Sequence, residues 1–452
     1  MKTNTETNSV SSDAAHAAVC APRLSEKRLA ANRSCYIAEA GLEYLISLLI
    51  TDSFLARLLT SNGVSDSAAG IVTELASFAF SAQIVSVFFR KRSGMKRFIT
   101  LLHLANQIMF VLLYFVPVFN IPSGVKAPLI ALMFLGGHVI ANIVSPYKIS
   151  WFMSYVPDKS RGKFTANKEI VSLACGTVFS LIMGSVSDYY KSVGNDEAYF
   201  TVCAAAILVL AVLHMLSILL VRESENSTAA DDTYHIGFSE ALKKTFSDRM
   251  LIKIIFIDVI WQFSSKLSIA YYGVYKNNEL GFSMKYVALL SVLSAVSRIS
   301  FSRFFGKLAD RYSWLSMLKI CFGVAACAFF INIFTVPSNG KWMFAAYSCI
   351  YAVSMAGINS GLMNVIFDYT IPEDRAPSLG IKSALGGISG FLSSFLGGYI
   401  VHTVQSGGNK IGGLTVYGQQ ILSAITFTLC IVLIIYVTFI LGKGKNKSEH
   451  KK

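Results

Sequence analysis

The chain has 452 residues, of which 54% are hydrophobic and only 15% are charged. A soluble domain carries about 25% charged residues, and its core could not bury this much apolar surface. The composition therefore excludes a soluble protein, and it supplies enough apolar residues for about twelve bilayer-spanning helices. The net charge of +14 would suggest nucleic acid in a soluble chain. Here it favours cytoplasmic loops that face anionic lipid, so we expect no nucleic-acid partner.

Hydrophobic segments predict two groups of six spans, separated by a polar linker with a short helical stretch at Ser239–Phe246. In chain order the predicted parts are a disordered cytosolic N-tail (1–35), an N-terminal half (36–221), a cytosolic linker (222–248), a C-terminal half (249–441) and a basic cytosolic C-tail (442–452). The predicted spans are 36–60, 66–89, 98–119, 127–153, 163–188, 199–221, 249–275, 284–305, 314–336, 342–370, 378–402 and 417–441.

Lysine and arginine residues outside the spans gather in the two tails, the linker and alternate loops. Basic residues of this kind stay on the cytoplasmic side of a membrane, so both ends of the chain are predicted to lie inside. We therefore expect an all-α polytopic protein of the cell membrane, plasma or bacterial inner, with twelve transmembrane helices.

The two halves repeat each other weakly. Sliding the sequence by 214 residues superposes matching basic residues and glycines of the fourth-to-fifth and tenth-to-eleventh spans: Arg161 on Arg375, Lys168 on Lys382, Gly176 on Gly390 and Gly184 on Gly398. Such a match predicts two pseudo-symmetric six-helix bundles related by an axis along the membrane normal.

The loop between the eighth and ninth spans carries the sequence GKLADR, Gly306–Arg311. This loop resembles the G-x-L-a-D-R signature of the major facilitator superfamily, and the six-plus-six layout is similar to that family over residues 36–441. The chain departs from the family pattern at Ser313–Leu315, and the equivalent first-half loop, Phe89–Arg97, has no acid. The resemblance therefore implies the family's fold but no subfamily.

The resemblance also implies a cytosolic gate around Asp310. This acid can accept hydrogen bonds from the positive N-terminal end of the fifth helix, which begins near Lys163, and from basic side chains. Such a latch would favour the outward-open state. The alternative is that Asp310 and Arg311 only order the loop and set the topology. The expected gate residues are Gly306, Asp310, Arg311, Arg161, Lys168, Arg375 and Lys382.

Charged groups inside the spans should face a cavity or the bundle interior, because facing lipid costs several kcal/mol. In the seventh span, Asp258, Gln262 and Lys266 follow at i, i+4 and i+8 on one helical face. The resemblance implies that the first, fourth, seventh and tenth helices line a central cavity, so this stripe is a candidate substrate contact. A structural Asp–Lys relay is the alternative, although about 12 Å along the axis prevents direct pairing of Asp258 with Lys266.

The first span carries a similar stripe of Glu39, Glu43 and Ser47. Glu43 lies deep enough that burial penalises its charged form, a condition for a carboxylate that takes up and releases protons. Glu43 and Asp258 are therefore the proton-coupling candidates, whereas Glu39 is expected nearer the interface as a solvated or gate charge. Three outer charges, Asp52, Arg57 and Glu74, are expected to form ion pairs with one another.

The fourth and tenth spans supply further cavity candidates. Lys148 follows Pro146, and its cation could bind an anionic substrate or pair with Glu43 when the site is empty. Snorkelling to the cytosolic surface is the alternative for Lys148. Asn142 in the fourth span, with Asn359 and Asn364 in the tenth, offers amide donors and acceptors, although polar helix packing explains the tenth-span amides as well.

The sequence contains no nucleophile–base pattern, nucleotide-binding loop or metal-ligand spacing. The eight cysteines are scattered and predict small apolar fillers. We therefore expect a monomeric secondary active transporter, not an enzyme, that moves a small polar or anionic solute by alternating access. It would need no cofactor beyond a proton or sodium gradient, with proton symport favoured. The alternatives are drug or metabolite efflux by the same fold, and a membrane sensor or scaffold without transport.

Overall fold

The computed structural model describes residues 25–88, 95–157, 161–223, 238–370, 372–411 and 413–448. The first half comprises α2 (Glu26–Leu49), α3 (Asp52–Ser61), α4 (Asp66–Ala79), the 3-10 helix η1 (Phe80–Phe88), α5 (Met95–Phe115), α6 (Ser123–Met153), α7 (Arg161–Ser192) and α8 (Asp196–Leu219). The linker helix α9 (Phe238–Ser247) leads to α10 (Arg249–Ile269), α11 (Tyr272–Val274), the π-helix η4 (Tyr275–Glu279), α12 (Met284–Arg311), α13 (Trp314–Ile333), α14 (Gly340–Tyr369), α15 (Pro372–Ser406) and α16 (Gly418–Ser448), with strands β1 (Lys410–Ile411) and β2 (Leu414–Thr415) before α16.

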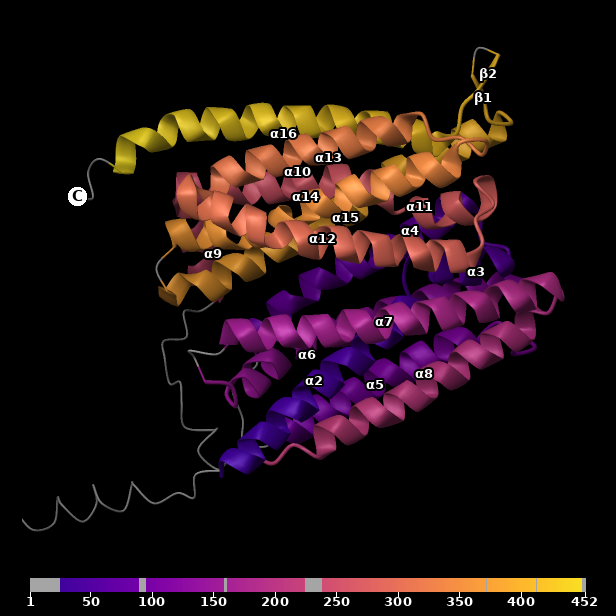
Figure 1. Ribbon diagram of the computed structural model, residues 1–452, viewed down its shortest axis with the longest axis horizontal. Helices are drawn as coiled ribbons and strands as arrows, with labels where there is room; N and C mark the ends of the chain where they lie inside the picture. Colours follow the sequence, from indigo (N-terminus) through magenta and orange to yellow (C-terminus); the bar gives the residue numbers. More distant parts are fainter. Residues whose placement is uncertain are drawn as a thin grey trace, which may run out of the picture.

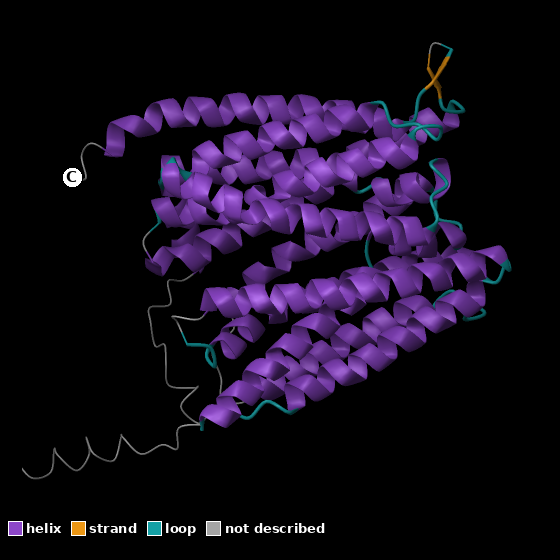
Figure 2. Cartoon of the chain, viewed as in Figure 1, coloured by secondary structure: helices purple, strands orange, loops and turns teal. Residues whose placement is uncertain are grey.

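The helices form two bundles that lie side by side (Figure 1). The second half has a buried apolar core of its own, whereas the main core of the first half continues into Leu267, Tyr271 and Val401 of the second. The halves also meet where α4 packs against α15 and α7 packs against α12. Figure 2 shows helices joined by loops, and the short hairpin of β1 and β2, which the sequence did not predict, contains the strands of the described chain. The predicted all-α polytopic fold is therefore confirmed, and α9 confirms the predicted helix in the linker.

Ten helices of the described chain are long and apolar enough to cross a membrane. The two other predicted spans form α2–α3 and α10–α11–η4, and both contain several charged residues along the helix. Glu39 and Glu43 lie in the first of them, and Asp258 and Lys266 lie in the second. Helices α2 and α10 have 24 and 21 residues, so both are long enough to cross a membrane although they carry these charges. The count of twelve spans stays a prediction.

The first helix begins earlier than predicted. Residues 26–35 are helical, so the prediction of a disordered tail is wrong for these residues. Residues 1–24 lie outside the described chain. Asn32 fixes this extension because its side chain donates to the carbonyl of Arg222 at 2.9 Å and accepts from the Arg222 N–H at 3.0 Å. At the other end of the chain, α16 continues to Ser448, seven residues beyond the predicted span.

Polar contacts between the two halves gather at the end of the bundle where α3, α11 and η4 lie. Lys276 pairs with Asp52 there, and the Asn277 amide donates to the Ser53 carbonyl at 2.9 Å. Nearby, Asp188 accepts from the backbone N–H groups of Met284 and Lys285 at 2.7 and 2.9 Å, which places its charge at the positive end of α12. At the opposite end, where α2 begins and α16 ends, the halves diverge (Figure 1).

Candidate functional site

A cavity of about 490 Å³ lies in the first half, between α2, α5, α6 and α7. This volume falls within the range of about 300–1,000 Å³ that is usual for small-molecule sites. Apolar and polar side chains share its wall: Ala40, Glu43, Tyr44, Ile46, Ser47, Ile50, Asn106, Gln107, Phe110, His138, Ala141, Thr165, Lys168, Glu169 and Ser172. Glu43 is the only one of the predicted cavity candidates among these lining residues.

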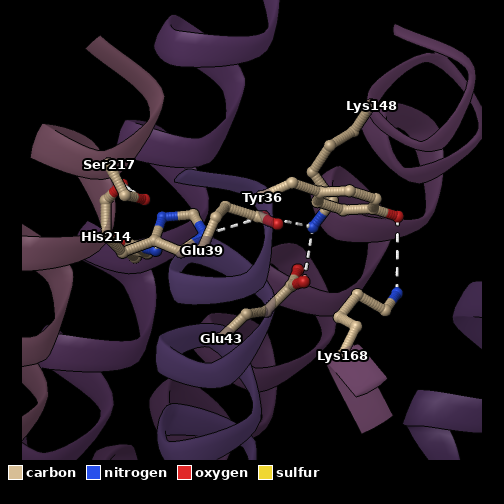
Figure 3. Close-up of polar contacts among 8 residues, drawn as sticks. Tyr36, Glu39, Glu43, Lys148, Lys168, His214 and Ser217 are labelled. Carbon is tan, nitrogen blue, oxygen red and sulfur yellow. Dashed lines mark hydrogen bonds and ion pairs between the residues drawn. The ribbon is translucent and has the colours of Figure 1, made fainter. Parts of the chain in front are cut away.

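An ion-pair network adjoins this cavity (Figure 3). The Lys148 ammonium lies 2.8 Å from Oε1 of Glu39 and also pairs with Glu43. Glu39 has no exposed surface and Lys148 is 4% exposed, whereas 42% of the Glu43 side chain is exposed. Lys148 therefore does not snorkel to the surface, and Glu39 is not a solvated charge near the interface. Because α6 continues through Pro146, Lys148 reaches these carboxylates from a continuous helix.

A histidine that the sequence pattern did not predict also belongs to the network. Nε2 of His214 in α8 lies 3.0 Å from Oε1 of Glu39, and Nδ1 lies 2.6 Å from the amide nitrogen of Gln107. The His103 ring lies 5.0 Å from the His214 ring, and neither of its nitrogens has a hydrogen-bond partner in the described chain. A single histidine within each apolar span was the only sequence signal for either residue.

The same network contains a possible set of metal ligands. Three ligand atoms lie within 4.8 Å of one another, one each from Glu39, Glu43 and His214. This spacing is compatible with a metal ion. Lys148 already pairs with both carboxylates, so its ammonium supplies the positive charge that a metal would otherwise bring.

Lys168 of α7 also lines the cavity. Its ammonium donates to the Tyr36 hydroxyl at 3.4 Å and lies 4.7 Å from the centre of the Tyr36 ring, a cation–π contact. The ring is held in place by Phe152, which stacks on it at 4.3 Å. Among the side chains that the structure describes, Lys168 forms no ion pair with a carboxylate. The structure thus places a predicted gate residue in the cavity wall.

The seventh-span stripe divides between two neighbours. Asp258, 2% exposed, lies 3.6 Å from the Lys382 ammonium on α15. The two helices come close here because residue 386 is glycine, and a Cβ at that position would lie 2.5 Å from the Asp258 carboxylate and 3.1 Å from Gln262. Lys266 turns toward the other half, 3.4 Å from Glu74 on α4. Asp258 and Lys266 therefore have separate partners, as their axial separation predicts.

The asparagine candidates lie apart from the cavity. Asn142 is buried, accepts from Gln83 at 3.0 Å and donates to the His138 carbonyl at 2.9 Å. Asn364 donates to the carbonyl of Ser360 on its own helix at 2.8 Å, and Asn359 is exposed. None of the three lines the cavity. The bond from Gln83 joins Asn142 to a neighbouring helix, whereas the bond of Asn364 stays within its own helix.

The expected latch is not formed among the side chains that the structure describes. Asp310 is exposed and has no ion pair or hydrogen bond there, while the Arg311 guanidinium lies 5.4 Å from the Tyr312 ring centre. Gly306 has open space around its Cα. The side chains of Arg161 and Arg375 lie outside the described part of the chain.

The expectation for the three outer charges is wrong, because they do not pair with one another. Asp52 pairs with Lys276 and Glu74 with Lys266, both across the two halves, whereas Arg57 pairs with Asp196 at the start of α8. Charges that lie close in the sequence thus sit on helices whose nearest neighbours come from elsewhere in the fold.

Known proteins resemble the chain in fold. The model of the Major Facilitator Superfamily matches residues 35–398, while no curated protein matches the chain by sequence. The nucleoside transporter NupG superposes with a TM-score of 0.71 at 11% identity, over 91% of this chain and 99% of that one. A D-xylose–proton symporter superposes with a TM-score of 0.63 at 14% identity, over 89% of this chain and 96% of that one. A bacterial homolog of the human lysosomal transporter Spinster, solved inward-facing and unoccupied, superposes with a TM-score of 0.64 at 15% identity, over 92% of this chain and 96% of that one.

Proposed function

The chain belongs to the major facilitator superfamily, and we propose that it moves a small polar or anionic solute by proton-coupled alternating access. The family and the structural neighbours indicate a transporter and not an enzyme. The observation that carries the finer proposal is the 490 Å³ cavity with Glu43 in its wall, backed by the buried pair of Glu39 and Lys148. A buried charge network beside a ligand-sized cavity is typical of a coupled transport pathway.

The distribution of contacts between the halves supports alternating access. Lys276–Asp52, Lys266–Glu74 and the Asp188 contacts hold one end closed, while Asp310 at the other end is without a partner in the described chain. We propose that the closed end faces outward and that the open end faces the cytosol of a cell bearing the protein in its plasma or inner membrane, as the basic loops favour. Transport would then require the outer contacts to break and the Asp310 latch to form.

Reconstitution of the purified protein in liposomes tests the proposed function. We expect accumulation of at least one solute from a broad panel of small sugars, nucleosides, amines and carboxylates when the lumen is more alkaline than the medium. The expected drive is the proton gradient, so a sodium gradient at equal pH should leave uptake at its passive level. Absence of gradient-dependent movement for every solute would overturn the proposal.

Neutral substitutions separate the two proton-coupling candidates. Glu43→Gln or Asp258→Asn is expected to abolish pH-driven accumulation while leaving energy-independent exchange, for whichever residue carries the proton. The reason is that exchange needs no net proton movement, whereas accumulation does. Of the two, Glu43 is the stronger candidate because it alone lines the cavity. If both variants keep the pH dependence of the parent, neither residue is the carrier.

A further inference from the structure

We propose that the cavity binds a small organic monocarboxylate, whose carboxylate replaces that of Glu43 beside Lys148 and Lys168 while Glu43 takes up the co-transported proton. This inference rests on the proposed function and names its substrate class. It follows from the unequal burial of two carboxylates, an unpaired cation and the apolar part of the cavity wall.

The two carboxylates that pair with Lys148 differ in how firmly they are held. Glu39 is completely buried, and His214 also contacts its Oε1 at 3.0 Å. Glu43 faces the cavity with 42% of its side chain exposed, and Lys148 is its one ion-pair partner in the described chain. Glu39 alone can neutralise Lys148, so Glu43 is the partner that an incoming anion can displace.

Lys168 supplies the second cation. It lines the same cavity as Glu43, and its polar contacts within the described chain are with the hydroxyl and the ring face of Tyr36. Figure 3 shows Glu43 pointing toward Lys148, with Lys168 reaching the Tyr36 hydroxyl beside them. A cation without a carboxylate partner in a partly apolar cavity favours an anionic ligand, because the ligand's charge replaces the lost hydration.

Charge conservation then links the anion to a proton. The empty site holds Glu43 as an anion beside Lys148. When a monocarboxylate takes that position, Glu43 loses its cation and binds one proton from the aqueous phase, so the site gains one negative and one positive charge. The occupied cavity thus has the same net charge as the empty one. The conformational change that carries the ligand across the membrane therefore buries no additional charge. One carboxylate is carried with one proton.

The apolar part of the wall fits the body of such a molecule. Beyond Glu43 on α2, the cavity is lined by Ile46 and Ile50, and Phe110 of α5 contributes an aromatic face. These side chains offer apolar surface but no charge. A ligand with a carboxylate at one end and a short apolar body matches this part of the wall.

Other titratable groups surround Glu43, and the pH dependence must be assigned against them. They come from each neighbouring helix: Glu39 on α2, His103 on α5, Lys148 and His138 on α6, Lys168 and Glu169 on α7, and His214 on α8. Three of these residues are histidines, the residue type whose ordinary pKa lies nearest to neutral pH, so a variant of Glu43 itself is needed to attribute the linked proton.

Calorimetric titration of the purified full chain in detergent tests the proposal without any gradient. The probes are acetate, butanoate and benzoate, each against its amide, between about pH 5.5 and about pH 8. We expect carboxylate affinity to rise as pH falls, with a limiting slope of about −1 in log K per pH unit, since one proton is taken up. The amides should bind much more weakly and without this slope.

Two substitutions give the decisive comparison. Glu43→Gln is expected to bind carboxylates more tightly than the parent and without the pH slope, because the internal competitor and the linked proton are both removed. Lys168→Met should weaken carboxylate binding by about 10- to 100-fold, whereas Glu169→Gln, a change to another cavity carboxylate, should keep the slope. A retained slope in Glu43→Gln, or amides that bind as well as the acids, would overturn the inference.

The failure of this inference is distinguishable from that of the proposed function. If liposomes accumulate a neutral solute under a proton gradient while carboxylates do not bind, the monocarboxylate site is wrong and the transporter stands. If carboxylates bind with the expected slope but nothing is transported, the site stands and the transport proposal falls.

Discussion

Lys148→Met is expected to destabilise the protein by about 3–5 kcal/mol, the typical cost of leaving a buried charge without its partner. Glu39 has no exposed surface, and the Lys148 ammonium lies 2.8 Å from its Oε1. The variant can fold only if Glu39 binds a proton that the unfolded chain releases at neutral pH, so its stability should fall further as pH rises. Thermal unfolding of purified protein at several pH values measures both effects.

The double variant Glu39→Gln/Lys148→Met provides the matched control. It removes both charges, so most of the lost stability should return and the added pH dependence should disappear, which a double-mutant cycle reports as a strong coupling. Lys341→Met, a change to an exposed lysine, should shift stability by no more than about 0.5 kcal/mol. A Lys148→Met protein as stable as the parent at every pH would show that the buried pair does not hold the first half together.

The features that the sequence predicted are those that depend on local pattern. Hydrophobic segments and their polar interruptions indicated the two helical halves and the linker helix α9, because span length and hydropathy are properties of contiguous residues. Helical periodicity likewise placed Glu39 and Glu43 on one face of α2. In the structure both of these carboxylates pair with the Lys148 ammonium.

The features that the sequence did not predict depend on which helices pack against each other. Asn32 and Arg222 are 190 residues apart in the chain, and their mutual hydrogen bonds extend α2 into the expected tail. His214 is one polar residue in an apolar helix, and only the packing of α8 against α2 brings it to Glu39. Glu74 finds Lys266 across the two halves for the same reason. Helical periodicity predicts which residues share one face of a helix, but it does not predict which other helix packs against that face.

Joining Asp52→Cys to Lys276→Cys with a short thiol crosslinker is expected to abolish transport in liposomes. Lys276 lies in η4 of the second half and pairs with Asp52 in α3 of the first, at the end where polar contacts between the halves gather. Alternating access requires this end to open, so a covalent link should hold uptake at the level of empty liposomes. The measurement uses a background without the eight native cysteines and a reducible linker, so that uptake returns on reduction.

A second pair tests whether the link between the halves is the cause. Arg57 and Asp196 also form an ion pair, but both lie in the first half, on α3 and α8. Crosslinking Arg57→Cys to Asp196→Cys should therefore leave uptake close to its value in the same protein after reduction, because the two helices keep their relative position as the halves move. Comparing each variant with its own reduced form removes the effect of the lost ion pair. Equal inhibition by both links would contradict rigid-body movement of the halves, and undiminished uptake with Asp52 linked to Lys276 would contradict opening at this end.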